Sequence, residues 1–211
     1  MKNKLLLLFF LLGVFFPLSA QESEVLISTS HTSLLLSTSQ GGELKFLYYG
    51  RKLTDADVHA IVSTESGSFS AYPVYGLNCP SESALSVQHE DGNMTLQMEV
   101  IGVETTHQEK ANLTVISLKD KVYPFYVKFC YKAYQDVDVI EAWTEISHKE
   151  KKNVKLNQFA SAYLPVRKGN VWLSSLYGAW ANEARLVQEP LEPGMKVIKN
   201  KDGVRNSHTA H

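Results

Sequence analysis

Two pairs of aspartates have a spacing that could serve acid–base chemistry. Asp55 with Asp57, and Asp136 with Asp138, are each two residues apart. On a strand, such residues share a face, near the carboxyl separation of about 5 Å that glycoside hydrolysis uses. Neither pair has a group of aromatic and polar residues around it in the sequence. We therefore interpret both pairs as turn caps or exposed strand ends, and predict no catalytic residue in this chain.

Other motifs for metal, nucleophile or phosphate chemistry are weak or missing. His208 and His211 have the spacing of two metal ligands on one helix face, but no third ligand follows them. The sequence contains no Gly-x-Ser-x-Gly elbow and no glycine-rich phosphate loop. We therefore predict neither a metal nor a cofactor.

Aromatic residues are the remaining candidates, because their rings can stack on sugars as well as fill a core. For Trp143 and Trp172 we favour the core, and for the loop tyrosines less so. The set of six is Tyr72, Tyr75, Trp143, Trp172, Tyr177 and Trp180.

The elements that would position these residues are strands. Between Val122 and Leu164, three runs of aromatic and β-branched residues are separated by short polar breaks. In the first run, the alternation places Phe125, Val127, Phe129, Tyr131 and Ala133 on one face. This period of two indicates strands with one buried face. We expect a three-stranded antiparallel meander at the centre of a large sheet.

The rest of the chain repeats this pattern at the spacing of an all-β sandwich. Asp91-Gly92 predicts a hairpin, and residues 54–57 could start a single helical turn. For residues 176–188 a short amphipathic helix is the alternative, but the surrounding β pattern favours a strand. The other predicted strands are 24–27, 33–36, 44–50, 85–87, 94–100, 113–118, 171–176 and 195–198.

The first 20 residues have the pattern of a secretory signal peptide. Lys2 and Lys4 precede an apolar run that ends before Ala20, so we expect cleavage there and a secreted or periplasmic protein.

The balance of 21 Lys+Arg against 22 Asp+Glu argues against a nucleic-acid partner. Cys79 and Cys130 could pair in a secreted chain, but we favour the interpretation that both are free thiols. Residues 21–211 are predicted to form one β domain.

Several motifs, in their order and spacing, resemble the N-terminal domain of glycoside hydrolase family 36, the α-galactosidases. Cys79 and Ser81 depart from the resemblance, because they stand where that family usually has an acidic residue and an arginine. The matching motifs are Tyr48-Tyr49-Gly50, Tyr72-Pro73 with Tyr75-Gly76, Asp138-Val139-Ile140, Gly178-x-Trp180-x-x-Glu183, Leu191-x-x-Gly194, and Ser207-His208.

The resemblance implies a galactose-mutarotase-like antiparallel β-supersandwich that precedes a (β/α)8 catalytic barrel. In that family an aspartate nucleophile and an aspartate acid/base, both in the barrel, cleave terminal α-galactose with retention. We expect this chain to be truncated before the barrel and inactive alone, and the resemblance is compatible with a homo-oligomer. Tyr75, Asn78 and Trp180 are its candidate substrate contacts.

If a barrel is the missing partner, a face near the end of the chain should be apolar and exposed. The alternatives are a freestanding carbohydrate-binding β-sandwich and a structural or adhesive surface protein. The residues expected on the docking face are Leu176, Tyr177, Trp180, Leu186 and Val187.

Overall fold

The structure is a computed structural model of the 211-residue chain. It describes residues 23–38, 42–64, 69–76, 82–166, 169–179 and 181–198. The chain forms two compact units, Met1–Pro165 and Val166–His211. Several sequence predictions lie outside the described residues, namely the signal peptide, Asn78, Cys79, Trp180 and the His208/His211 pair.

The first unit starts with an antiparallel sheet in the order β1-β2-β3-β4. Leu34 and Leu36 of this sheet belong to the main core, whereas Leu35 points to the other face and is buried there. Both faces of the sheet are therefore covered at β2. The strands are β1 (Glu24–Ser28), β2 (Thr32–Thr38), β3 (Leu44–Arg51) and β4 (Phe69–Ser70).

The helix α1 (Asp55–Thr64) covers the second face of this sheet, where Val58 packs with Leu35 and Leu47. Its first turn is a capping box. Asp57 N donates to Thr54 Oγ1 at 3.3 Å, and Thr54 N donates to Asp57 Oδ2 at 2.9 Å. The predicted single turn is too short. Val58 is the one buried residue of α1, and Ile61 and Val62 are partly buried beside it, so the apolar stripe that the sequence shows is only three residues long.

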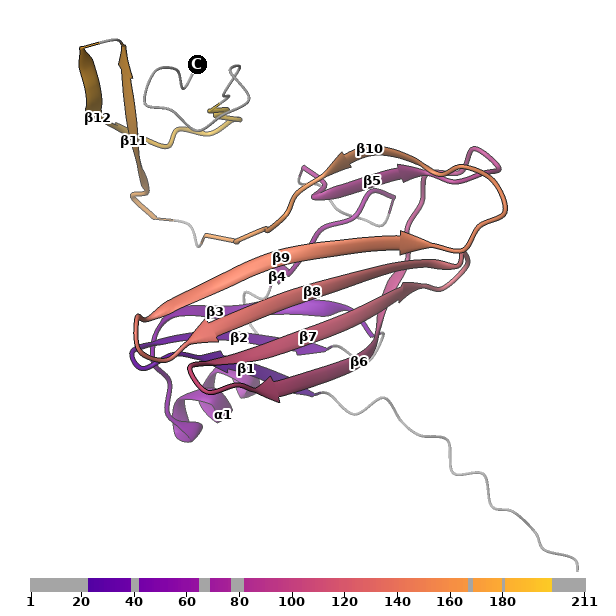
Figure 1. The fold of residues 1–211 in the computed structure, drawn as a ribbon, viewed down its shortest axis with the longest axis horizontal. Helices are drawn as coiled ribbons and strands as arrows, with labels where there is room; N and C mark the ends of the chain where they lie inside the picture. Colours follow the sequence, from indigo (N-terminus) through magenta and orange to yellow (C-terminus); the bar gives the residue numbers. More distant parts are fainter. Residues whose placement is uncertain are drawn as a thin grey trace, which may run out of the picture. The chain divides into compact units, whose positions relative to one another are not determined.

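The second sheet has the order β6-β7-β8-β9, and every neighbouring pair is antiparallel. The predicted alternation is confirmed on β8, where Phe125, Val127 and Phe129 are buried and Lys128 is exposed. This sheet lies across the first one as a second layer (Figure 1). Its strands are β6 (Met98–His107), β7 (Ala111–Asp120), β8 (Phe125–Tyr134) and β9 (Val139–His148).

The predicted meander is wrong in its third strand. β10 (Lys155–Phe159) pairs with β5 (Leu85–Gln88) in a separate two-stranded sheet, rather than with β9. The physical reason lies in the polar break before β10. Its Glu150 carboxylate contacts His89 Nδ1 at 2.8 Å, and its Lys152 N donates to Glu90 Oε2 at 2.9 Å, just after β5. These contacts fix the chain beside β5.

The turn predicted at Asp91-Gly92 forms, but it joins no hairpin. Gly92 N donates to His89 O at 2.9 Å, and Gly92 has a φ of +89°. The chain that follows does not pair with β5, and β6 starts only at Met98. A tight turn specifies a reversal of direction, whereas the strand partner depends on packing elsewhere.

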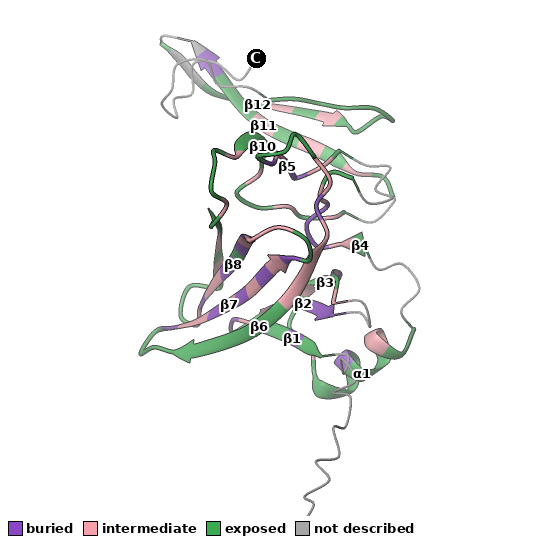
Figure 2. Cartoon of the chain, turned by 90° about the vertical axis from the view of Figure 1, so that its right-hand side faces the viewer, coloured by how far each residue is buried: buried purple, intermediate pink, exposed green. Residues whose placement is uncertain are grey.

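The main core lies between the two four-stranded sheets. Its fully buried members include Leu36 from one sheet and Ile116 and Val127 from the other. Figure 2 shows buried residues alternating along β7 and β8, as expected for strands with one face on the core. The fold of the first unit is therefore mostly β and antiparallel.

The second unit is built on one hairpin, β11 (Trp172–Ala179) with β12 (Asn182–Pro190). The strand interpretation of residues 176–188 is thereby confirmed over the helical alternative. The predicted strand at residues 195–198 is wrong, because this described segment has no ladder partner and is exposed. No helix in the described ranges is long and apolar enough to cross a membrane.

Candidate functional site

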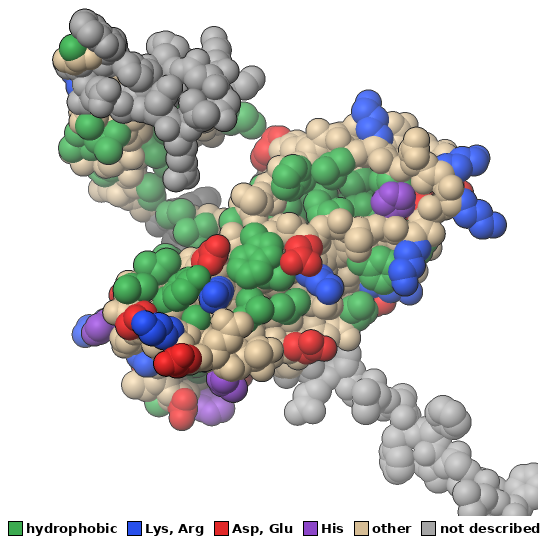
Figure 3. Space-filling view, in the orientation of Figure 1, with side chains coloured by type: hydrophobic (Ala, Val, Ile, Leu, Met, Phe, Trp, Pro, Cys, Tyr) green, Lys and Arg blue, Asp and Glu red, His purple; other side chains and the backbone are tan. Residues whose placement is uncertain are grey.

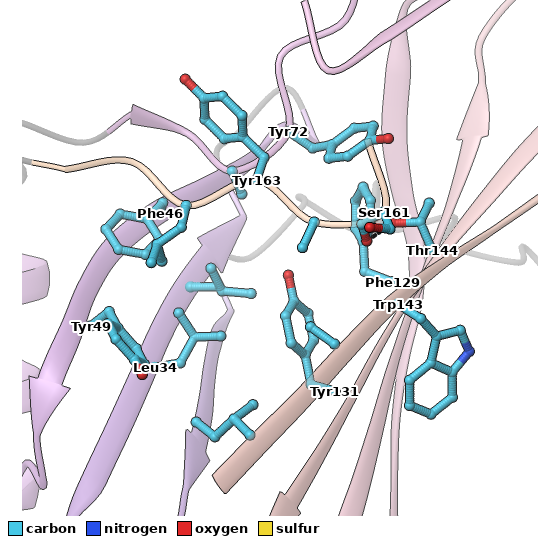
Figure 4. Close-up of a pocket in the computed structure, with 16 residues that line it drawn as sticks. Leu34, Phe46, Tyr49, Tyr72, Phe129, Tyr131, Trp143, Thr144, Ser161 and Tyr163 are labelled. Atoms are coloured by element: carbon cyan, nitrogen blue, oxygen red, sulfur yellow. Dashed lines mark hydrogen bonds between the residues drawn. The ribbon is translucent and has the colours of Figure 1, made fainter. Parts of the chain in front are cut away.

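A pocket of about 170 Å³ opens between the two four-stranded sheets of the first unit. We call it the inter-sheet pocket. Its walls come from β2 and β3 on one side and from β8 and β9 on the other, and residues 161–164 close it (Figure 4). None of its described lining residues carries a charge. This composition is unsuited to acid–base catalysis.

The inner wall of the pocket is aromatic and buried. Phe46 comes from β3, Phe129 from β8 and Tyr72 from the segment after β4, and each is under 10% exposed. The rings of Tyr72 and Phe129 have centroids 4.7 Å apart at a tilted angle of 53°. Burial raises the pKa of Tyr72, and its hydroxyl donates to Ala160 O at 2.5 Å. Tyr72 is therefore a satisfied core residue.

Tyr131 is different, because its hydroxyl points into the pocket (Figure 4) and makes no hydrogen bond to any described residue. Burial raises the pKa of Tyr131 to about 12, so the phenol is neutral at physiological pH. A neutral phenol can donate one hydrogen bond and accept another. Tyr131 therefore offers a polar group inside the pocket that no described residue satisfies.

The cover of the pocket is a segment we call the strap, residues 160–164. Thr144 Oγ1 donates to Ser161 O at 2.8 Å, and Ala160 N donates to Ala84 O at 2.7 Å. These two contacts fix the start of the strap. Its far end is open, since Leu164 is 54% exposed although it lines the pocket.

Trp143 was expected in the core, and the structure corrects this. It lies opposite Cys130 on β8, and its indole points away from the pocket (Figure 4) onto the outer face of the sheet. There its Nε1 donates to Glu145 Oε1 at 3.1 Å. Figure 3 looks onto this outer face, where hydrophobic side chains are bordered by acidic and basic ones. Trp172, also expected in a core, is 61% exposed in the second unit.

The comparison with known families decides the relationship of this chain to other proteins. Residues 42–211 match the glycosyl hydrolase family 36 N-terminal domain. The chain belongs to this family. The match covers most of the chain and includes both units, so the hairpin β11–β12 is part of the family 36 domain. The comparison with curated proteins gave no match.

Solved structures of family 36 enzymes share the fold. The α-galactosidase of Lactobacillus brevis superimposes with a TM-score of 0.72 at 19% identity, over 86% of this chain and 29% of its own. The enzyme AgaA of Geobacillus stearothermophilus, in complex with 1-deoxygalactonojirimycin, gives 0.71 at 20% identity, over 82% and 28%. The galactosidase domain of the α-galactosidase–sucrose kinase AgaSK gives 0.69 at 21%, over 80% and 28%. The chain thus spans under a third of each relative.

Of the three predicted substrate contacts, the structure describes Tyr75 alone. Tyr75 follows β4 and is 49% exposed, and it does not line the inter-sheet pocket. Its backbone is fixed at both ends, because Tyr75 N donates to Leu85 O at 3.0 Å and Leu96 N donates to Tyr75 O at 3.1 Å. The next residue, Gly76, has a φ of +107° and lies so close to Thr95 that a Cβ would clash at 2.7 Å. Tyr75 is thus presented on an anchored segment of the family 36 domain.

One aspartate of each pair, Asp57 and Asp138, has a structural role. Asp57 caps α1, and the hydrogen bonds from Thr54 lower the pKa of its carboxyl. Asp138 has a φ of +52° and accepts hydrogen bonds from Thr29 Oγ1, and from His31 N and Thr32 Oγ1 at 3.2 Å each. Chiefly through the bond from Thr29, the pKa of Asp138 is also lowered. The Asp138 carboxylate therefore ties the β8–β9 turn to the β1–β2 turn.

Sequence reasoning missed two buried polar sites of the family 36 domain. One is the His89–Glu150 pair, whose partners are 61 residues apart. The other is Asp120, fully buried, whose carboxylate accepts from Gln97 N at 2.5 Å, Val122 N at 2.8 Å and Tyr123 N at 2.7 Å. Asp120 lies in the short polar stretch between the predicted strand 113–118 and the run that starts at Val122, which is the signal that could have identified the second site. Within the described ranges, no three His, Cys, Asp or Glu side chains group as metal ligands would.

Proposed function

We propose that this chain is the N-terminal, non-catalytic domain of a secreted α-galactosidase-like glycoside hydrolase, with a galactose-mutarotase-like supersandwich fold. The whole enzyme would release terminal α-D-galactose with retention, using an aspartate nucleophile and an aspartate acid/base in a (β/α)8 barrel. The observation that carries the proposal is the family match over residues 42–211 in a chain that spans only about 28% of related enzymes. The uncharged lining of the inter-sheet pocket agrees with a non-catalytic role.

The substrate class follows from the relatives. Variants of AgaA of Geobacillus stearothermophilus have been solved in complex with raffinose and with stachyose. We infer that the whole enzyme to which this chain belongs acts on α-galactoside oligosaccharides of this kind. The described part of the domain would support the barrel rather than supply catalytic groups.

The exposed side chains of the second unit support the inference that this domain has a catalytic barrel as its partner. Leu176 and Leu186 lie directly opposite each other across the hairpin and are 59% and 61% exposed. Trp172 is opposite Pro190 and is 61% exposed. Exposed apolar side chains grouped in this way are typical of a contact surface. We infer that this hairpin face contacts the catalytic barrel.

A freestanding carbohydrate-binding sandwich is the second candidate. It is favoured by the exposure of Tyr75 and by the position of Trp143 on the outer sheet face. Aromatic rings on a flat sheet face can stack on sugars. This alternative would need no barrel.

The test is hydrolysis of an aryl α-galactoside by the purified chain, together with the DNA that follows its coding sequence. We expect no turnover above a matched blank, because the nucleophile and the acid/base lie elsewhere. We expect the downstream DNA to encode barrel strands with two aspartates. Turnover that is lost in Asp138→Asn would contradict the proposal. Binding of an α-galactoside that is lost in Trp143→Ala, without downstream barrel DNA, would favour the second candidate.

A further inference from the structure

The inter-sheet pocket has a shape and a lining that the proposed non-catalytic role does not explain. A space of about 170 Å³ between packed sheets is unusual, because protein interiors leave few voids larger than a water molecule. An apolar cavity of about 150 Å³ in another protein holds benzene, which sets the scale for one ring. The pocket volume therefore fits a single six-membered ring with a small substituent.

The residues that line the pocket determine which chemical class of ring it can bind. A charged ligand would be buried without a counter-charge, since no described lining residue is ionised. A sugar would bury several hydroxyl groups, each of which needs a hydrogen-bond partner. Of the lining side chains that carry a hydroxyl, Tyr72 and Thr144 are already engaged, because Tyr72 donates to Ala160 O and Thr144 donates to Ser161 O. Tyr49 and Ser161 are exposed residues, and the Tyr163 hydroxyl points away from Tyr131 (Figure 4). Sugars and ions are therefore poor ligands for this pocket.

The unused hydroxyl of Tyr131 supplies the specific contact. It points into the pocket beside the rings of Phe129 and Tyr72, and the strap lies across from it (Figure 4). On β9, Ala142 is directly opposite Tyr131 and also lines the pocket, so a small side chain leaves the space open there. A ligand ring would lie against aromatic walls while its one polar atom meets Tyr131 Oη.

We propose that the inter-sheet pocket binds a small uncharged aromatic molecule of the phenol class, with one polar atom hydrogen-bonded to Tyr131. The ligand enters past the exposed end of the strap, at Leu164. The inference rests on the pocket alone and does not depend on the proposed function.

The experiment titrates the full 211-residue chain with phenol and with benzene, and follows methyl resonances by NMR. The Leu34 and Ala142 methyl groups line the pocket, whereas the Leu26 methyl groups, on a residue 42% exposed on β1, report non-specific binding. We expect saturable shifts at Leu34 and Ala142 only, with phenol bound more tightly than benzene.

Variants test the assigned contacts. Tyr131→Phe should weaken phenol about twofold to tenfold, as for one neutral hydrogen bond, and leave benzene unchanged. Tyr126→Phe is the matched control, because Tyr126 is on the same strand but on the outer face. Ala142→Leu should abolish binding of both probes by filling the pocket. Ala162→Leu on the strap is a second filling variant, in case the first does not fold, and circular dichroism checks both.

Three outcomes would overturn the proposal. One is the absence of saturable shifts with either probe, which would mean that the pocket stays empty or closes. Another is unchanged binding in a folded filling variant, which would place the ligand elsewhere. The last is an unchanged phenol affinity in Tyr131→Phe, which would remove the polar contact that defines the ligand class.

Discussion

His89 and Glu150 form a buried pair that joins β5 to the segment before β10. Their Nδ1 and Oε1 atoms are 2.8 Å apart, and their side chains are 0% and 2% exposed. The imidazole stacks on Tyr123 with ring centroids 3.6 Å apart, and its Nε2 has no hydrogen-bond partner among the described residues. Glu150 also accepts from Glu90 N at 3.2 Å. One carboxylate thus binds two groups of the segment that follows β5, about 60 residues away in the chain.

Removing the Glu150 carboxylate should lower the stability of the folded chain. Glu150→Ala leaves a buried imidazole without its partner, and we expect a loss of about 3 kcal/mol in the free energy of unfolding, measured by urea denaturation. Glu150→Gln keeps an acceptor and should lose less. Glu104→Ala, at an exposed position on β6, is the control and should change stability by under about 0.5 kcal/mol. Equal midpoints for Glu150→Ala and the control would show that the pair adds no stability.

Asp138 should make the fold sensitive to acid. Its pKa is lowered by hydrogen bonds from Thr29, His31 and Thr32, so it binds its proton less readily in the folded state than in the unfolded state. Its contribution is fully present above the ordinary aspartate pKa and is lost as pH falls through the lowered value. Asp138→Asn keeps a residue that tolerates positive φ but removes the charge.

The measurement for Asp138 compares urea midpoints of the parent chain and Asp138→Asn between pH 7 and pH 2. The difference should be constant near pH 7 and shrink as acid protonates Asp138. Asp136→Asn, in the same turn and equally exposed, is the control. A difference that does not change with pH would mean that the charge of Asp138 has no part in holding the two turns together.

The capping box of α1 gives a third prediction. Thr54→Ala removes the hydroxyl that accepts from Asp57 N, and should cost about 1 kcal/mol. Thr64→Ala at the other end of the helix is the control, since its hydroxyl bonds only to carbonyls of the preceding turn. Thermal unfolding followed by circular dichroism distinguishes the two. Equal melting temperatures would argue against a capping contribution.

The exposed leucines of the hairpin predict self-association of the isolated chain. We expect the parent chain to bind a hydrophobic dye and to elute above its monomer mass. The double substitution Leu176→Ser with Leu186→Ser should reduce both signals, because it removes the apolar pair. Leu26→Ser, which removes an exposed leucine from the first unit, should reduce neither. A parent chain that is monomeric and does not bind the dye would count against the inferred barrel contact.

The predicted leader peptide can be checked directly. If residues 1–20 are removed on export, the mature protein begins at Gln21. Mass spectrometry of the protein from the periplasm or medium of an expressing bacterium tests this. A mass that includes Met1 would show that the segment is retained.

Local periodicity determined much of this fold. The alternation of Phe125, Val127 and Phe129 predicted both the strand and its buried face, because side chains on a strand point alternately to its two sides. The strand interpretation of residues 176–188 followed from the surrounding β pattern, but the reversal that divides this segment between β11 and β12 was not predicted. The family resemblance, based on short motifs in order, was also present in the sequence alone and is confirmed by the match over residues 42–211.

Tertiary structure decided what depends on distant partners. β10 leaves the meander because Glu150 and Lys152 are bound next to β5, and no local pattern encodes a contact between residues about 60 apart. α1 is longer than predicted because Val58, Ile61 and Val62 pack against the first sheet, and the sequence does not show which surface such a short apolar stripe will meet. The inter-sheet pocket is likewise invisible in the sequence. Its walls come from strands of both sheets, and only their packing leaves Tyr131 facing an open space.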